Sequence, residues 1–306
     1  MTDKQKKAVV TGGAGFIGTH ITRELLAQGW DVVVVDNLSG GKKSNVPKDA
    51  TFHKLDVCKT PALTKIFEGA DAVFHLAALP RVQFSIEFPQ LAHQANVDGT
   101  LSVLVAARDA KVGRVVYSAS SSVYGDQKKM PLTEDMTANP NSPYGLQKYI
   151  GEEYCKLFCE AYQLPTVCLR YFNVYGPGAN EEGAYALVIA KFLKLRREGK
   201  SMTITGTGKQ TRDFTHVRDV VRANILAAES KKVGKGETIN IGAGHNASVN
   251  AIAKLIGGPK EYIPARLESR DSLADNSKAK RLLGWKPTVS LEEGIAELKE
   301  LSGLNK

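Results

Sequence analysis

The feature that most constrains the fold is an alternation between short apolar, β-branched segments and longer segments with helical periodicity. The apolar segments lie at residues 8–11, 32–35, 52–57, 72–78, 115–118 and 166–172, and the helical patterns lie at 16–28, 90–109 and 143–163. Strands that are apolar on both faces and alternate with helices are typical of a parallel sheet covered by helices on both sides. The sequence therefore predicts an α/β protein with a doubly wound parallel sheet.

The pattern loosens past about residue 180. There we expect a helix at 185–198, short strands at 202–205 and 238–241, and otherwise loops. The sequence shows no internal repeat, low-complexity tract or flexible linker that would mark a sharp boundary. We predict a larger unit over residues 1–175 and a smaller C-terminal lobe over 176–306, with some of the later chain returning to the sheet.

Composition narrows the class of protein. Hydrophobic residues make up 42% and charged residues 24% of the chain, and no apolar run approaches the length of a membrane span. We therefore expect a cytoplasmic protein without a membrane partner. The net charge of +9 suits an anionic partner, either nucleic acid or a phosphorylated metabolite, and charge alone does not decide between them. No cysteine lies near a histidine at metal-ligand spacing, so we expect no metal site.

A glycine pattern follows the first predicted strand. In "AVVTGGAGFIGTH", Gly12 allows a tight turn, Gly15 allows close approach of a pyrophosphate, and Gly18 lets the following helix pack on the strand. The next strand ends in Asp36, eighteen residues after Gly18, where a carboxylate can accept hydrogen bonds from ribose hydroxyls. This Rossmann pattern predicts NAD rather than NADP, although residues 42–43 are lysines. The alternative is a glycine turn that serves packing alone.

A second group of polar residues lies farther along the chain. Tyr144 and Lys148 are i and i+4 on one predicted helix, so an ammonium can lie beside a phenol. A neighbouring cation and a positively charged nicotinamide would lower the pKa of Tyr144 from about 10 toward neutrality and make it a general base. A serine hydroxyl from the run "SASSS" at the end of the fifth strand would reach the same substrate oxygen. Taken alone, a tyrosine and a lysine at this spacing on a helix more often have a structural role.

The sequence resembles the extended short-chain dehydrogenase/reductase family and, within it, the NAD-dependent UDP-sugar 4-epimerases. The matching stretches are "TGGAGFIG", "VVVDNLSGGKKSNV", "FHLAA", "NVDGTL", "SSVYGD", "SPYGLQK", "LRYFNVYGPG", "QTRDFTHVRDV" and "SLADNSKAKRLLGW". The resemblance implies an NAD-binding Rossmann domain at 1–175 and a mainly nucleotide-sugar-binding lobe at 176–306. It also implies a homodimer formed through helices 90–109 and 143–163, with a UDP-sugar and no nucleic acid as partner.

The resemblance assigns site residues position by position. The implied catalytic residues are Ser120, Tyr144 and Lys148. The implied cofactor-binding residues are Gly12, Gly15, Phe16, Ile17, Gly18, Asp36, Asn37, Asp56, Val57, Leu76, Ala77, Ala78, Asn96, Tyr144, Lys148 and Tyr171. The implied substrate-binding residues are Ser120, Ser121, Tyr144, Asn173, Thr203, Arg212, Arg266 and Ser272, with Arg270 as the alternative to Arg266. Arg81 and Arg218 are further cations near these residues in the sequence, but such arginines are more often surface residues than ligands, and we leave both out.

The residues after Ser120 narrow the reaction. The related sugar 4,6-dehydratases place an Asp-Glu pair directly after the catalytic residue, whereas this chain has Ser121 and Ser122. With dehydration excluded, the remaining reaction is reversible oxidation at C4 with a recycled NAD, and this reaction is 4-epimerisation. In the family the position of Ser272 faces the 2-substituent of the sugar, so a serine there predicts that N-acetylated UDP-hexoses fit as well as UDP-glucose and UDP-galactose. Thr205 replaces a residue that is often aromatic and stacks on the uracil.

Three alternatives remain open at this point. The first is a UDP-glucuronate 4-epimerase, and the second is another nucleotide-sugar oxidoreductase that releases NADH. The third is a non-enzymatic NAD-sensing or RNA-binding scaffold on the same fold, which would have no need of the complete Ser-Tyr-Lys set.

Overall fold

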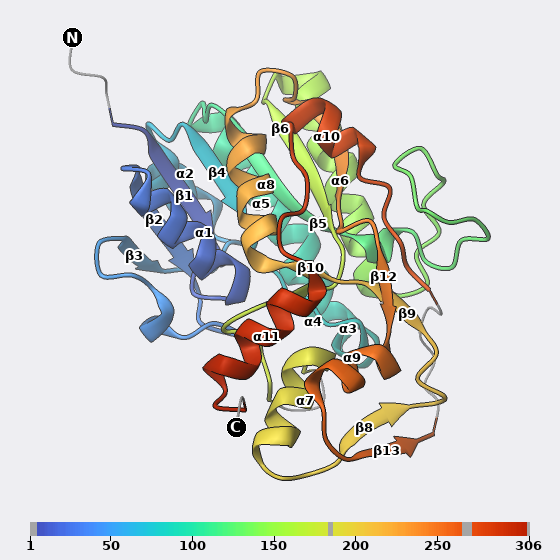
Figure 1. The fold of residues 1–306 in the computed structure, drawn as a ribbon. Coiled ribbons are helices and arrows are strands. Elements are labelled where there is room, and N and C mark those ends of the chain that lie inside the picture. Colours follow the sequence, from blue (N-terminus) through green and yellow to red (C-terminus); the bar gives the residue numbers. More distant parts are fainter. Residues whose placement is uncertain (1–4, 183–185, 265–270, 305–306) are drawn as a thin grey trace.

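The computed structural model describes residues 5–182, 186–264 and 271–304, and its main feature is a seven-stranded sheet between two layers of helices (Figure 1). The strand order is β11-β6-β5-β4-β1-β2-β3, and every pair is parallel. The strands are β1 (Lys7–Thr11), β2 (Asp31–Asp36), β3 (Thr51–Lys54), β4 (Ala72–His75), β5 (Val115–Ser120), β6 (Thr166–Tyr171) and β11 (Lys235–Ile241). The predicted doubly wound parallel sheet is confirmed.

Helices cover both faces of this sheet and bury two apolar cores. One core contains side chains of α1 (Phe16–Ala27), α8 (Val217–Glu229) and α10 (Ser277–Leu283). The other contains side chains of α2 (Thr60–Phe67), α5 (Gly99–Asp109) and α6 (Pro143–Tyr162). The predicted helix 90–109 is found as α4 (Pro89–His93), a π-helical stretch (Gln94–Asp98) and α5, preceded by the short α3 (Val82–Glu87).

A second unit packs below the carboxyl edge of the sheet in the view of Figure 1. It consists of α7 (Val188–Arg197), α9 (Val249–Ile256), α11 (Leu291–Leu301) and the parallel pair β8 (Met202–Thr205) and β13 (Lys260–Ile263), around a core of its own. Two small pairs lie between the units: β7 (Val174–Tyr175) with β10 (Thr215–His216), and β9 (Thr211–Asp213) with β12 (Asn246–Ser248).

The expectation of mainly loops in the last third was wrong. Helices α8, α9, α10 and α11 lie there. β11 contains the predicted strand 238–241 and pairs with β6 at the edge of the main sheet, as expected of chain that returns to it. α8 buries Val217, Val220, Val221 and Ile225 at helical spacing. Because the run "FTHV" before it also has strand character, the start of this helix is ambiguous in the sequence.

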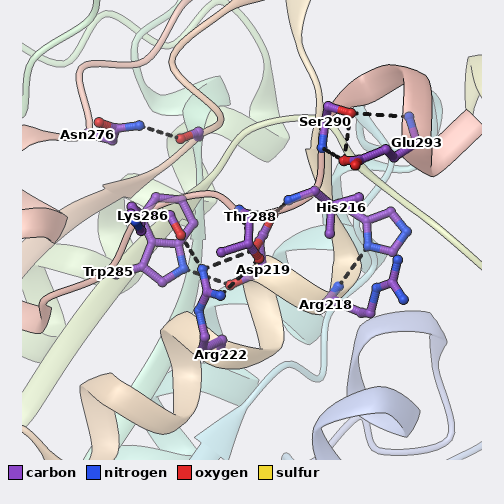
Figure 2. Close-up of polar contacts among 12 residues, drawn as sticks. His216, Arg218, Asp219, Arg222, Asn276, Trp285, Lys286, Thr288, Ser290 and Glu293 are labelled. Carbon is purple, nitrogen blue, oxygen red and sulfur yellow. Dashed lines mark hydrogen bonds and ion pairs between the residues drawn. The ribbon is translucent and has the colours of Figure 1, made fainter.

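The C-terminal segment is attached to α8 by a buried carboxylate (Figure 2). Asp219 is 1% exposed and accepts hydrogen bonds from the backbone amide and hydroxyl of Thr288, while its carbonyl oxygen accepts one from the indole of Trp285 at 2.8 Å. Ser290 and Glu293 then form a capping box that begins α11. The segment between α10 and α11 is thereby fixed to the helical layer of the large unit.

Candidate active site

The glycine turn after β1 forms a cradle at the carboxyl edge of the sheet. Gly12 has φ +73°, and a Cβ there would lie 2.6 Å from the backbone nitrogen of Ala77. A Cβ on Gly18 would collide with the carbonyl oxygen of Gly12. Gly15 caps α1 without a side-chain hydrogen bond, and no acidic residue lies in the first turn, which begins with Phe16 and Ile17. The amides of this turn are therefore suited to a pyrophosphate, as predicted for NAD.

The end of β2 supplies a carboxylate beside this cradle. Asp36 is 7% exposed, and its two oxygens accept hydrogen bonds from the amides of Ala14 at 3.0 Å and Leu38 at 2.7 Å. A carboxylate has about four acceptor positions, so these bonds fix its orientation and leave capacity for further donors. The arrangement fits a ribose with free hydroxyls.

Three further predicted cofactor residues lie next to Asp36 in the structure. The side chain of Asn37 donates a hydrogen bond to Asp56 at 3.0 Å. The backbone amide of Cys58 and then Asn37 hold the pKa of Asp56 below its ordinary value. Val57 is buried beside them, and the assignment of this group to the adenosine end of the site stays a prediction.

The predicted channel residues follow β4. Leu76 and Ala77 donate backbone hydrogen bonds to the carbonyl and hydroxyl oxygens of Thr11, and Ala78 follows them half-buried. Asn96, in the π-helical stretch, is 1% exposed and accepts a hydrogen bond from the amide of Leu79 at 2.7 Å. The loop after β4 is therefore fixed to β1 on one side and to the helical layer on the other.

The three predicted catalytic residues come from β5 and α6. Ser120 is the last residue of β5, and Ser121 begins the short 3-10 turn that follows. Tyr144 lies in the first turn of α6, is 8% exposed, and donates its backbone amide to the hydroxyl of Ser85 at 3.0 Å. Lys148, one turn later, is 3% exposed. The side chain of Ser120 acts on the phenol of Tyr144 and favours a lower pKa, so the end of the strand and the start of the helix bring these two groups near each other.

Burial dominates the electrostatics of Tyr144 and Lys148. Burial raises the pKa of Tyr144, while Ser120 and the charge of Arg81 act in the opposite direction. Burial lowers the pKa of Lys148 to about 8, and its ammonium donates to the carbonyl of Ser118 at 2.8 Å. The ammonium of Lys148 is thus held against the end of β5, and the lowering of the pKa of Tyr144 by Lys148 together with a charged nicotinamide stays a prediction.

Tyr171 lies apart from these groups. Its hydroxyl is within 3.0 Å of the hydroxyl of Ser118 and donates to Asn224 of α8 at 2.9 Å, and burial raises its pKa to about 12. The predicted cofactor residue is thus part of the core between the sheet and α8, with its hydroxyl already bonded.

Three of the predicted substrate-binding residues lie close together where the two units meet, namely Asn173, Arg212 and Ser272. Asn173, just past β6, donates to the carbonyl of Asp213 at 2.9 Å and to the hydroxyl of Ser272 at 3.4 Å. Arg212 precedes Asp213 on β9. Ser120, the last residue of β5, pairs in register with Tyr171 of β6. Asn173 follows Tyr171 by two residues and therefore lies near the end of β5. Thr203 lies on β8 in the second unit, and its hydroxyl is buried without a hydrogen-bond partner among the described residues. Arg266 and Arg270 lie outside the described residues.

The chain matches a known protein family over more than half of its length. A family model described as the NAD dependent epimerase/dehydratase family matches residues 8–242, more than half of the chain. The chain belongs to this family. The resemblance stated above is thereby confirmed at the family level, and the cradle around Gly12 and Asp36 stays the predicted NAD site.

Solved members of the epimerase/dehydratase family share the whole fold. The UDP-glucose 4-epimerase of Thermotoga maritima, solved with UDP-glucose, is 39% identical with a TM-score of 0.90 and covers 94% of this chain and 96% of its own. The UDP-N-acetylglucosamine 4-epimerase of Methanobrevibacter ruminantium, in complex with UDP-N-acetylmuramic acid, is 37% identical with a TM-score of 0.91 and covers 97% and 99%. The UDP-glucuronic acid 4-epimerase of Bacillus cereus, with UDP-glucuronic acid and NAD, is 34% identical with a TM-score of 0.89 and covers 97% and 99%.

The structure places the two arginines that the sequence analysis left out of the site differently. Arg218 is 59% exposed at its side chain and pairs with Glu297 at 2.7 Å, as expected for a surface arginine. Arg81 is half-buried, and its charge acts on Tyr144. The one available signal was its place directly after the segment 72–78, at the carboxyl end of a strand, where ligands bind in open α/β sheets.

Within residues 5–182, 186–264 and 271–304, no group of three or more His, Cys, Asp or Glu side chains is arranged to hold a metal ion. Across the same part of the chain, none of the helices combines the length and the apolar character needed to span a bilayer.

Proposed function

We propose that the protein catalyses NAD-dependent 4-epimerisation of a UDP-hexose. The observation that carries this proposal is the meeting of Ser120 and Tyr144 at the carboxyl edge of the sheet that also bears the glycine cradle. The two residues after Ser120 are serines, so no acid stands there to eliminate water. Ser120 and Tyr144 can move a proton at a sugar hydroxyl, but the residues around them offer no acid that could eliminate water from the sugar.

Each residue would have one role at the C4 hydroxyl. Bound NAD supplies the acceptor and then the donor of the C4 hydride, which leaves no net redox change. Tyr144 would take the hydroxyl proton and later return it, and Ser120 would donate a hydrogen bond to the same oxygen. Lys148, anchored on Ser118, would hold the nicotinamide ribose, and Asp36 the adenosine ribose.

The second unit would bind the nucleotide sugar. Arg212 would pair with the diphosphate, where a guanidinium can form two parallel charged hydrogen bonds. Asn173 would contact the diphosphate-sugar, and the small side chain of Ser272 beside it leaves room for a 2-N-acetyl group. The solved relatives named above bind UDP-glucose, UDP-N-acetylmuramic acid and UDP-glucuronic acid, which supports a UDP-sugar as substrate class.

Anomeric proton NMR tests this function directly. Purified protein is incubated without added NAD with UDP-galactose, UDP-N-acetylgalactosamine or UDP-galacturonate. We expect conversion of the first two to the gluco forms. Conversion of UDP-galacturonate alone would instead favour a UDP-glucuronate 4-epimerase, and steady release of NADH would favour a dehydrogenase. No conversion of any of the three, even after NAD is added, would overturn the proposal.

The variant Ser272→Tyr tests the substrate range in the same assay. The added ring fills the space beside Asn173, so we expect turnover of UDP-N-acetylgalactosamine to fall by tenfold or more, a steric loss of about 1.4 kcal/mol, while UDP-galactose is still converted. Full activity of the variant on the N-acetylated sugar would rule out Ser272 as the residue that sets the 2-position limit.

We also propose that the chain forms a homodimer through α4–α5 and α6. Leu146 and Leu157 are half-exposed on the outer face of α6, and a groove there is lined by Tyr149, Ile150 and Tyr154. Exposed apolar residues also occur on the neighbouring α3 and α4, at Ile86 and Leu91. Light scattering should return twice the mass of the chain, and a monomeric mass at assay concentration would contradict this interface.

A further inference from the structure

Asp213 is a buried carboxylate at the junction of the two units. It is the last residue of β9, directly follows the proposed diphosphate ligand Arg212, and is 0% exposed. Its Oδ1 accepts the backbone amide of Ala243 at 2.7 Å, and its Oδ2 accepts the amides of Gly244 at 2.9 Å and Ala274 at 3.0 Å. The carboxylate therefore joins β9 to two segments that are distant in the sequence, the turn between β11 and β12 and the chain that precedes α10.

The backbone of Asp213 holds two of the proposed substrate-binding residues. Its carbonyl oxygen accepts the side-chain amide of Asn173 at 2.9 Å, and its amide donates to the hydroxyl of Ser272 at 3.4 Å. Because neighbouring residues of a strand point to opposite faces, fixing the side chain of Asp213 also fixes the direction in which Arg212 leaves β9. The three proposed substrate residues are thus all held through one buried residue.

The segment that carries Ser272 is bonded on both of its sides. Ser272 donates its amide to the carbonyl of Thr211 at 3.1 Å, and Leu132 donates its amide to the carbonyl of Leu273 at 2.7 Å. The amide of the next residue, Ala274, takes part in neither contact and donates to the buried carboxylate. The depth at which this segment lies against the pocket is therefore set by the carboxylate.

We propose that Asp213 is a positioning residue for the nucleotide sugar, because it assembles Arg212, Asn173 and Ser272 into one pocket. This inference rests on the proposed function for the identity of the ligand, a UDP-sugar. The proposed catalytic residues come from β5 and α6, which the carboxylate does not contact. Loss of its acceptor capacity should therefore weaken binding of the nucleotide sugar and leave the chemical step intact.

The variant Asp213→Asn is the primary test. It keeps the shape of the side chain, but an NH₂ group replaces one oxygen, and because both oxygens face backbone amides, a donor then meets a donor in either orientation. We expect KM for UDP-galactose to rise about tenfold or more while kcat stays within about threefold, the pattern of lost uniform binding. The Kd of UDP alone, measured by calorimetry, should also rise about tenfold, and the NAD content should be unchanged.

The matched control is Asp219→Asn. Asp219 is 1% exposed and likewise accepts backbone amides, from Thr288 at 3.0 Å and Val289 at 3.1 Å, but these lie between α10 and α11 (Figure 2). We expect both variants to lose thermal stability, whereas KM should change by less than about threefold in Asp219→Asn. If Asp213 served stability alone, the two variants would behave alike, with less active protein and an unchanged KM.

The variant Gly242→Ala tests the same contact if Asp213→Asn does not fold. A Cβ on Gly242 would collide with the Cβ of Ala274 and lie 3.0 Å from Oδ2 of Asp213, so it would push the Ser272 segment away from an unaltered carboxylate. KM for UDP-galactose and the Kd of UDP should rise in this variant as well, with the NAD content retained.

The outcomes separate this inference from the proposed function. If the protein epimerises UDP-hexoses but Asp213→Asn keeps KM and the Kd of UDP within about threefold, the inference is overturned and the function stands. If the unaltered protein binds UDP but converts no UDP-sugar, the function fails, and a Kd of UDP raised about tenfold in Asp213→Asn still supports the inference. Failure of the unaltered protein to bind UDP would overturn both.

Discussion

Replacing Tyr144 by phenylalanine should lower the turnover number for epimerisation by roughly 10²- to 10⁴-fold, the range over which positioned general bases contribute. The change removes only the hydroxyl. Because Tyr144 is 8% exposed and its backbone amide is held by Ser85, the ring should stay in place and the NAD site should remain intact. Anomeric proton NMR measures the loss, and release of NAD on denaturation shows whether the cofactor is retained.

The matched control for this variant is Tyr149→Phe. Tyr149 is on the same helix but lines the groove on its outer face, away from Ser120. We expect its loss of hydroxyl to change turnover by less than about threefold. A Tyr144→Phe protein that stays within tenfold of the unaltered enzyme would show that another group removes the C4 proton.

The largest effect on stability is expected at a buried ion pair behind the catalytic helix. Arg170 of β6 donates to Glu152 of α6 through Nε at 2.9 Å and Nη2 at 2.7 Å, and the two side chains are 5% and 2% exposed. Burial raises the pKa of Glu152, and the guanidinium opposes that rise. Arg170→Met leaves a carboxylate buried without its partner, so the free energy of unfolding should fall by about 3–5 kcal/mol.

Chemical denaturation of the ligand-free protein measures this change. Arg197→Met is the matched control, because Arg197 pairs with Glu181 at the same 2.7 Å but with side chains 44% and 35% exposed. An exposed pair contributes about 0–1 kcal/mol, so the control should be nearly neutral. The double variant Glu152→Gln/Arg170→Met should recover part of the loss. Equal losses for Arg170→Met and Arg197→Met would contradict the assigned importance of burial.

The sequence predicted most of the large unit and the candidate catalytic group because both depend on local patterns. The apolar runs at β1, β2 and β6 allow no other placement than a sheet buried on both faces. Since parallel strands end at one edge, a serine run after β5 and a tyrosine beginning the next helix could be expected to meet there. The confirmed sheet and family membership follow from these features.

Other features could not be read from local patterns because they depend on contacts between distant segments. β11 joins the sheet beside β6 after some 60 intervening residues, and no periodicity within it specifies that neighbour. Arg81 has the sequence appearance of a surface residue, and only the packing of α3 on α6 half-buries it. The position of the Lys148 ammonium depends on a free carbonyl at Ser118, which the sequence does not reveal.

The attachment of the C-terminal segment to α8 has a consequence for when the large unit can complete its folding during synthesis. Trp285 is 1% exposed and belongs, with Leu283, to the same apolar core as β1 and α1. The dinucleotide-binding half of the molecule therefore lacks part of its interior until residue 285 of 306 has been synthesised. Although domains generally fold from the N-terminus as they emerge, here the first unit to be translated must wait for nearly the last residues before its core closes.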